Sequence, residues 1–144
     1  MSHNVNQNPE NIFDEALQLN LEAKELEKAS KNEEAKEIYK KAVRLCEQAA
    51  NTGHPIAQYT LGLWNQNGKA GTQNYEAMAK WWTKAALQGH YKSAFALGIM
   101  HENGDHFDEC KKTAAQWYIK AIDIDHGYLE VIERLKSILN QDEA

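Results

Sequence analysis

The densest group of side chains that could carry out chemistry lies between His101 and Cys110. These ten residues hold two histidines, four carboxylates and one thiol, all of which can bind metals. A zinc-protease helix would need a histidine four residues after His101, and Asp105 stands there instead. A calcium loop needs acidic ligands in an order that this segment lacks. We therefore predict that the segment binds no metal and forms a loop, with Asp108 capping the next helix. A metal-dependent hydrolase that uses residues 101–110 is the least favoured of the three functions that we consider.

Three histidines recur at an interval of 36 residues, namely His54, His90 and His126. Neighbouring helices pack about 8–10 Å apart and repeat units at least that far, which is too long for shared metal ligation. We interpret these histidines as polar residues in the turns that open successive helices. The sequence also has no glycine-rich phosphate loop, nucleophile elbow or Cys–His arrangement. We predict a protein that is not an enzyme and needs no cofactor.

The 36-residue interval extends well beyond the histidines. Residues 53–68 align with residues 89–104, with identical or similar side chains at many positions. The same interval of 36 residues relates Cys46, Trp82 and Tyr118. A fixed period of this length is typical of helical repeat arrays, in which each unit buries its apolar face only against its neighbours. Such arrays present binding surfaces more often than catalytic sites.

The apolar periodicity predicts an all-α fold of about seven helices, because no segment shows the strict alternation of a strand. We expect Asn11 to cap the first helix, Asn32 to cap the second, and Pro55 to lie in the first turn of the third. The later helices are predicted from Pro55 to about Asn67, from about Gln73 to Gln88, from Tyr91 to Asn103, from Asp108 to Ile124 and from Tyr128 to Leu139.

Two glycines occupy the same repeat position inside helices, Gly62 and Gly98. Glycine in a helix interior costs about 0.5–1 kcal/mol relative to alanine. Their recurrence therefore indicates that neighbouring helices approach closely there, with aromatic side chains such as Trp82 and Tyr118 filling the space between helix pairs.

Composition and charge describe an ordinary small globular protein. The chain has 144 residues, of which 42% are hydrophobic, and a formal net charge of −5. Residues 1–53 carry a net charge of −3, residues 54–101 a net +3 and residues 102–144 a net −5. This distribution disfavours nucleic acid and favours a basic protein as partner. The sequence shows no membrane span, no secretory signal and no disulfide scaffold, so we predict a cytoplasmic protein with reduced thiols.

A wider set of residues recurs in the pattern of a known repeat. In the first copy these residues are Gly53, Ala57, Leu61, Gly62, Trp64, Gly68, Tyr75, Ala79, Trp81, Trp82, Lys84, Ala85, Ala86 and Gly89. The pattern resembles the Sel1-like repeat, a relative of the tetratricopeptide repeat, and the second copy departs from it at Ser93 and at residues 105–107. The resemblance implies a short right-handed α-solenoid of antiparallel helix pairs.

We divide the chain into a disordered lead at 1–10 and one repeat domain at 11–140. This domain comprises a helix pair at 11–52, repeats at 53–88 and 89–124, and a capping helix at 127–140.

The resemblance also implies a concave face, lined by the first helix of each pair, where a partner protein would bind. The expected contact residues are Ile56, Tyr59, Leu63, Gln66 and Asn67 in one repeat, and Lys92, Phe95, Ile99, Glu102 and Asn103 in the next. Leu17, Asn20, Lys24 and Lys28 would continue this stripe toward the N-terminus. Our leading hypothesis is a non-catalytic module that binds one partner protein in this groove. The alternative is a bacterial immunity protein that neutralises a basic toxin or effector.

Overall fold

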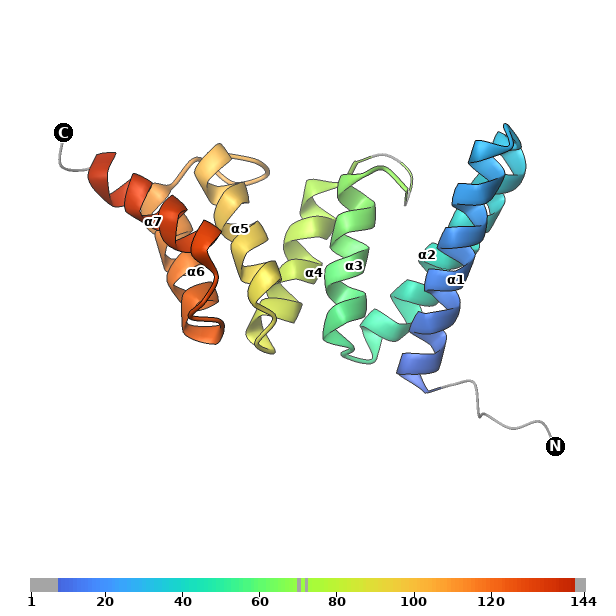
Figure 1. Ribbon diagram of the computed structural model, residues 1–144, viewed down its shortest axis with the longest axis horizontal. Helices are drawn as coiled ribbons and strands as arrows, with labels where there is room; N and C mark the ends of the chain where they lie inside the picture. The colour runs from blue at the N-terminus through green and yellow to red at the C-terminus, as the bar shows by residue number, and fades with distance from the viewer. Residues whose placement is uncertain (1–7, 70, 72, 142–144) are drawn as a thin grey trace. The chain divides into compact units, whose positions relative to one another are not determined.

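The computed structural model describes residues 8–69, 71 and 73–141, and within them the chain forms seven α-helices and no strand (Figure 1). The helices are α1 (Pro9–Lys28), α2 (Asn32–Asn51), α3 (Pro55–Gln66), α4 (Tyr75–Leu87), α5 (Tyr91–Asn103), α6 (Lys111–Ile124) and α7 (Leu129–Gln141). The predicted all-α fold is thereby confirmed. The predicted lead at 1–10 lies mostly outside the described residues, and α1 already begins at Pro9.

The helices fall into two compact units that divide inside α4, after Trp81. The N-terminal unit holds α1, α2, α3 and the first part of α4, and the C-terminal unit holds the rest of α4 with α5, α6 and α7. Among the described residues, no helix is both long enough and apolar enough to cross a membrane.

Two helices begin at other residues than the sequence predicted. The side chain of Asn8, not of Asn11, caps α1 by accepting a backbone hydrogen bond of 2.9 Å from its first turn. Pro9 follows in the first turn, where a missing N–H removes no hydrogen bond. α2 begins at Asn32 itself, after Lys31, and has no side-chain cap. The capping predictions for Asn11 and Asn32 were therefore wrong.

α6 also begins later than predicted, at Lys111 instead of Asp108. The ring of His101 stacks on that of Phe107, with centroids 4.0 Å apart and planes inclined by 10°. The N–H of Cys110 donates to the carbonyl of His101 at 2.9 Å. These contacts hold the segment before α6 against the end of α5, so the predicted cap at Asp108 was wrong.

His54 and His90 cap α3 and α5. Nδ1 of His54 accepts a hydrogen bond of 3.0 Å from the N–H of Ala57, and Nδ1 of His90 accepts one of 3.3 Å from the N–H of Ser93. His126 lies in the turn after α6, and its ring is instead 3.2 Å from the backbone carbonyl of Asp123 in the last turn of that helix. The interpretation of these histidines as residues that open helices is confirmed for two of the three.

In the N-terminal unit α1 lies along α2, and α2 packs on α3. One core cluster joins these helices to α4 and consists of Ile12, Phe13, Ala16, Ala42, Cys46, Ala49, Ala50, Ala57, Leu61, Trp64 and Trp81. The thiol of Cys46 is fully buried and donates to the carbonyl of Ala57 at 3.4 Å, and burial raises its pKa to about 12. A smaller cluster of Ala23, Ala35 and Tyr39 lies nearer the turn between α1 and α2.

In the C-terminal unit α5 lies along α6, and α7 packs on α6. α5 and α6 approach most closely at Gly98, where an added Cβ would lie 2.2 Å from Cε1 and 2.5 Å from Cδ1 of Tyr118. The ring of Tyr118 is fully buried, and the ring of Phe95 packs beside it at 5.7 Å between centroids. The close packing that the sequence indicated at Gly98 is confirmed.

We expect Gly98→Ala to lower the free energy of unfolding by about 1–3 kcal/mol, because α5 and α6 must move apart to admit the new methyl group. This exceeds the gain of about 0.5–1 kcal/mol that alanine brings to a helix. Urea unfolding followed by circular dichroism measures the difference. Gly127→Ala is the control, because its Cβ would meet only Oδ1 of Asp125 at 3.5 Å. A Gly98→Ala protein as stable as the wild type would contradict this prediction.

Acid should weaken the cap at His90. Burial and the nearby charge of Lys92 lower the pKa of His90, so the unfolded chain gains the proton at a higher pH than the folded chain. The stability that His90 contributes is therefore present above about pH 6.5 and is lost as the pH falls through the folded-state pKa.

His90→Asn keeps a capping side chain but removes the titrating ring. We expect the stability advantage of the wild type over this variant to shrink or reverse between pH 7.5 and pH 5, as measured by urea unfolding at both values. His90→Ala should cost about 1 kcal/mol at pH 7.5 through loss of the cap. An advantage that does not change with pH would refute the role of the ring.

Candidate functional site

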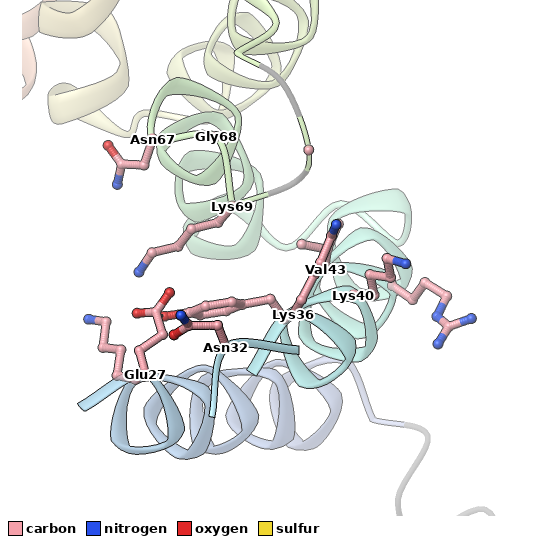
Figure 2. Close-up of a pocket in the computed structure, with 12 residues that line it drawn as sticks. Glu27, Asn32, Lys36, Lys40, Val43, Asn67, Gly68 and Lys69 are labelled. Carbon is pink, nitrogen blue, oxygen red and sulfur yellow. The ribbon is translucent and has the colours of Figure 1, made fainter. Parts of the chain in front are cut away.

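The N-terminal unit contains an open cleft of about 870 Å³ between the α1–α2 hairpin and the loop that follows α3 (Figure 2). Its lining residues are Lys24 and Glu27 from α1, Asn32, Lys36, Tyr39, Lys40, Val43 and Arg44 from α2, and Asn67, Gly68, Lys69 and Gly71 from the loop. The sequence predicted a contact role for only two of these residues, Lys24 and Asn67.

Tyr39 lines this cleft but is itself largely buried. The residue is 8% exposed, and its hydroxyl donates to Oε2 of Glu27 at 2.8 Å. Burial, together with the hydrogen bond and charge of Glu27, raises the pKa of Tyr39 to about 12. The carboxylate of Glu27 is thus already engaged by a neutral donor.

The loop after α3 directs Lys69 into the cleft. The N–H of Lys69 donates to the carbonyl of Trp64 at 3.0 Å, and the N–H of Gly71 donates to that of Gly68 at 3.1 Å. Both glycines have positive φ angles, 77° and 119°, a conformation that residues with a Cβ rarely adopt. The sequence Gly-Lys-x-Gly therefore allows the tight turn that places the lysine.

The ammonium group of Lys69 contacts residues of both helices of the hairpin. It donates to Oδ1 of Asn20 on α1 at 3.4 Å and lies 5.4 Å from the centroid of the Tyr39 ring on α2. Figure 2 shows it extending from the loop toward Glu27. Burial and the like charge of Lys24 lower the pKa of Lys69, although Glu27 partly opposes this effect.

Positive charge dominates the cleft. Of the described residues that line it, five are cationic and one, Glu27, is a carboxylate. Lys40 pairs with Glu37 at 3.1 Å, and both side chains are more than half exposed. Among the described residues, Lys24, Lys36 and Arg44 form no ion pair. The fold thus gathers like charges that an anionic ligand would neutralise.

The predicted stripe on α3 leads to this cleft. Ile56 is 51% exposed, Tyr59 and Leu63 are half-buried, and Gln66 and Asn67 are exposed. These residues recur at helical spacing on one face of α3, and the last of them lines the cleft.

The earlier part of the predicted stripe, on α1, has a mixed environment. Lys24 lines the cleft, Asn20 is buried and bonds Lys69, and Lys28 pairs with Glu25 at 2.9 Å on the surface. Leu17 packs against the core of the N-terminal unit.

The predicted stripe on α5 is only partly accessible. Lys92 and Asn103 are exposed and Ile99 is half-buried, whereas Phe95 is 8% exposed. The ring of Phe95 packs on that of Tyr128 at 5.3 Å between centroids, in an edge-on arrangement. Phe95 therefore serves the core of the C-terminal unit and offers little surface to a partner.

Glu102, also predicted as a contact residue, lies in an internal network. Its Oε2 accepts from the hydroxyl of Tyr118 at 2.6 Å and from Nε of Arg134 on α7 at 2.8 Å. Burial alone would raise the pKa of Glu102, but these two hydrogen bonds and the charge of Arg134 lower it. Burial and Glu102 raise the pKa of Tyr118. This network ties α5, α6 and α7 together.

In the segment from 101 to 110, the side chains that could bind a metal instead make contacts that stabilise the loop before α6. The rings of His101 and Phe107 are stacked, and Sγ of Cys110 lies 3.2 Å from Oγ1 of Thr113. Within the described part of the chain, no three His, Cys, Asp or Glu side chains gather as a metal site would require. Both cysteines are free thiols.

Sequence reasoning missed most of the cleft. Tyr39 was predicted on the apolar face of the second helix, and no role was predicted for Lys36 or Arg44. Residues 69–71 stood out as a place where the two repeats differ and where specificity could lie, but not as part of a cleft. The available signal was the Gly-x-x-Gly turn around Lys69, which places a single cation in a defined conformation.

Antiparallel helix pairs that pack through small residues define a helical repeat protein. The chain matches the Sel1 repeat family over residues 35–54, 55–90 and 92–126, and it belongs to this family. The resemblance inferred from the repeated residues is thereby confirmed. Sel1 repeat proteins generally act as protein–protein interaction modules and are typically non-catalytic.

Two solved structures show the same helical solenoid fold. A Sel1 repeat protein from Oxalobacter formigenes is similar over 94% of this chain and 50% of its own, with a TM-score of 0.71 and 24% sequence identity. The protective antigen c5321 of uropathogenic Escherichia coli strains, which displays an SLR fold, is similar over 75% of this chain and 25% of its own, with a TM-score of 0.56 and 28% identity. This chain thus spans half or less of the length of these two proteins. No curated protein matches the sequence.

The hydrogen bonds of Glu102 predict that Glu102→Gln lowers the free energy of unfolding by an amount that depends on pH. The lowered pKa of Glu102 means that its contribution is present above the unfolded value, about 4.3, and is lost as the pH falls through the folded value. Glu102→Gln should therefore lower the free energy of unfolding by about 1 kcal/mol at pH 7, since partial exposure weakens a charged hydrogen bond.

The difference between wild type and Glu102→Gln should shrink as the pH is lowered from 7 toward 3, as measured by chemical unfolding. Glu133→Gln is the control, because the pair of Glu133 with Lys136 is 72% and 64% exposed. Equal losses in the two variants would show that the network contributes no more than a surface pair.

Proposed function

We propose that this chain is a non-catalytic module that binds an extended segment of one partner protein, and that the cleft of the N-terminal unit is the centre of the contact. The observation that carries the proposal is the continuity of the α3 stripe with the cleft. An exposed apolar residue, Ile56, begins the stripe and an exposed amide, Asn67, ends it at the cleft.

The length of this surface supports a peptide more than a small molecule. Ile56 and Asn67 are eleven residues apart at the start and end of one helix, which corresponds to about 16 Å at about 1.5 Å per residue. An extended peptide covers that distance with about five residues. The surface also offers both apolar and hydrogen-bonding side chains, as interfaces do.

In the C-terminal unit, the accessible candidates on α5 are Lys92, Ile99 and Asn103. Phe95 and Glu102 would act from within, by holding α5 against the residues that follow α6. A partner contact there would therefore be made mainly by polar side chains.

The immunity hypothesis, in which the chain neutralises a basic toxin, is supported by the net charge of −5. The cation-lined cleft favours a different partner, because it would repel a basic segment. The free thiols fit a reducing compartment such as the cytoplasm. The hydrolase hypothesis loses its support, since His101 and Cys110 hold the loop before α6.

Selection from a random dodecapeptide library displayed on phage tests the proposal, because it requires no identified partner. The selected peptides are then photo-crosslinked to the full chain, with the crosslinking amino acid placed at position 36 in the cleft or at position 112 on α6. Both positions carry exposed lysines. We expect crosslinks from position 36 and few from position 112. Crosslinks mainly from position 112, or no enriched peptide, would overturn the proposal.

A further inference from the structure

The cations of the cleft have a regular arrangement on α2. Lys36, Lys40 and Arg44 follow one another at intervals of four residues, so they lie on one face of the helix about 6 Å apart along its axis. Alternate side chains of an extended peptide point the same way and are about 6.6–6.8 Å apart. The two spacings match closely enough for three successive contacts.

A second pair of cations lies toward α1. Lys24 and Lys69 both line the cleft there, although 45 residues separate them in sequence. The ammonium group of Lys69 reaches α1, where it donates to Oδ1 of Asn20 at 3.4 Å. Among the described residues that line the cleft, Glu27 is the one carboxylate, and it accepts the Tyr39 hydroxyl at 2.8 Å. One carboxylate beside two ammonium groups leaves a net positive charge next to an aromatic ring.

We propose that the cleft binds an acidic segment of the partner protein, with acidic residues at alternate positions facing α2 and one further carboxylate received between Lys24 and Lys69. This inference rests on the proposed function and adds the chemistry of the ligand. Val43, which is half-buried, supplies apolar surface in the cleft, and the largely buried Tyr39 adds only a small exposed area.

Several features favour a short acidic peptide over a nucleic acid. Residues 1–53, which form most of this surface, carry 10 acidic and 7 basic side chains, so a long polyanion would be repelled outside the cleft. Of the cations in the cleft only Arg44 can bind a phosphate with a planar fork of donors. An incoming carboxylate would also reverse the effect of burial and of Lys24 on the pKa of Lys69, so ligand binding and protonation of this lysine should reinforce each other.

Fluorescence anisotropy with defined probes tests the inference. The first probe is a labelled nonapeptide with glutamate at alternate positions and leucine or glycine between, and the second has glutamine in place of each glutamate. We expect the glutamate peptide to bind at least about ten-fold more tightly, and its affinity to fall as salt is added.

The variants then locate the site. The double variant Lys24→Gln/Lys69→Gln should bind the glutamate peptide about ten-fold more weakly than the wild type. We expect the same loss for the double variant Lys36→Gln/Arg44→Gln. Lys112→Gln with Lys136→Gln removes the same number of charges from exposed positions of the C-terminal unit and should change the affinity less than about two-fold. Thermal unfolding of each variant checks that the fold is retained, and the pair at 36 and 44 uses exposed residues for this reason.

Equal binding of the two peptides would overturn the inference, and so would equal losses in the cleft and control variants. The inference would also be overturned if a single-stranded deoxythymidine decamer bound as tightly as the glutamate peptide and lost this affinity in the same variants. That result would identify a general polyanion site. If neutral library peptides crosslink from position 36 while the glutamate peptide fails to bind, the proposed function stands and only the acidic partner is rejected. If nothing crosslinks from position 36, both fail.

Discussion

The C-terminal unit depends on the close approach of two helices at a position where no side chain intervenes. Gly98 leaves room for the ring of Tyr118, and the buried ring carries a hydroxyl to Glu102 near the end of α5. Arg134 of α7 joins the same carboxylate, so one glycine permits a contact that links three helices. Packing and hydrogen bonding are coupled there, because moving the ring would break both.

The α1–α2 hairpin has a comparable pair with a different outcome. Tyr39 on its second helix donates to Glu27 on its first, as Tyr118 does to Glu102. In the C-terminal unit an arginine completes the network, whereas in the N-terminal unit Glu27 faces Lys69 across an open cleft. The candidate site thus resembles the Tyr118–Glu102 pair, but no arginine binds its carboxylate among the described residues.

The net charge of the chain differs in sign from the charge of the candidate cleft. The chain carries −5 overall and its first 53 residues carry −3, which favoured a basic partner. Yet five cations and one carboxylate line the cleft in the part of the chain that the structure describes, because α1 and α2 turn many of their acidic side chains elsewhere on the surface. A net charge counted along the sequence adds up all faces of the protein, whereas a partner contacts the charges of one face.

The sequence by itself determined the repeat, the presence of the helices and two of their caps. His54 and His90 cap helices through hydrogen bonds that span three residues, so the nearby sequence suffices there. It did not suffice for the caps predicted at Asn11, Asn32 and Asp108, because those helices begin at other residues. Only the tertiary structure decided that Phe95 is buried and that Lys69 reaches α1 to line one cleft with Lys24. The physical reason is that helical periodicity shows which side chains share a face, whereas the elements that cover that face come from distant parts of the chain.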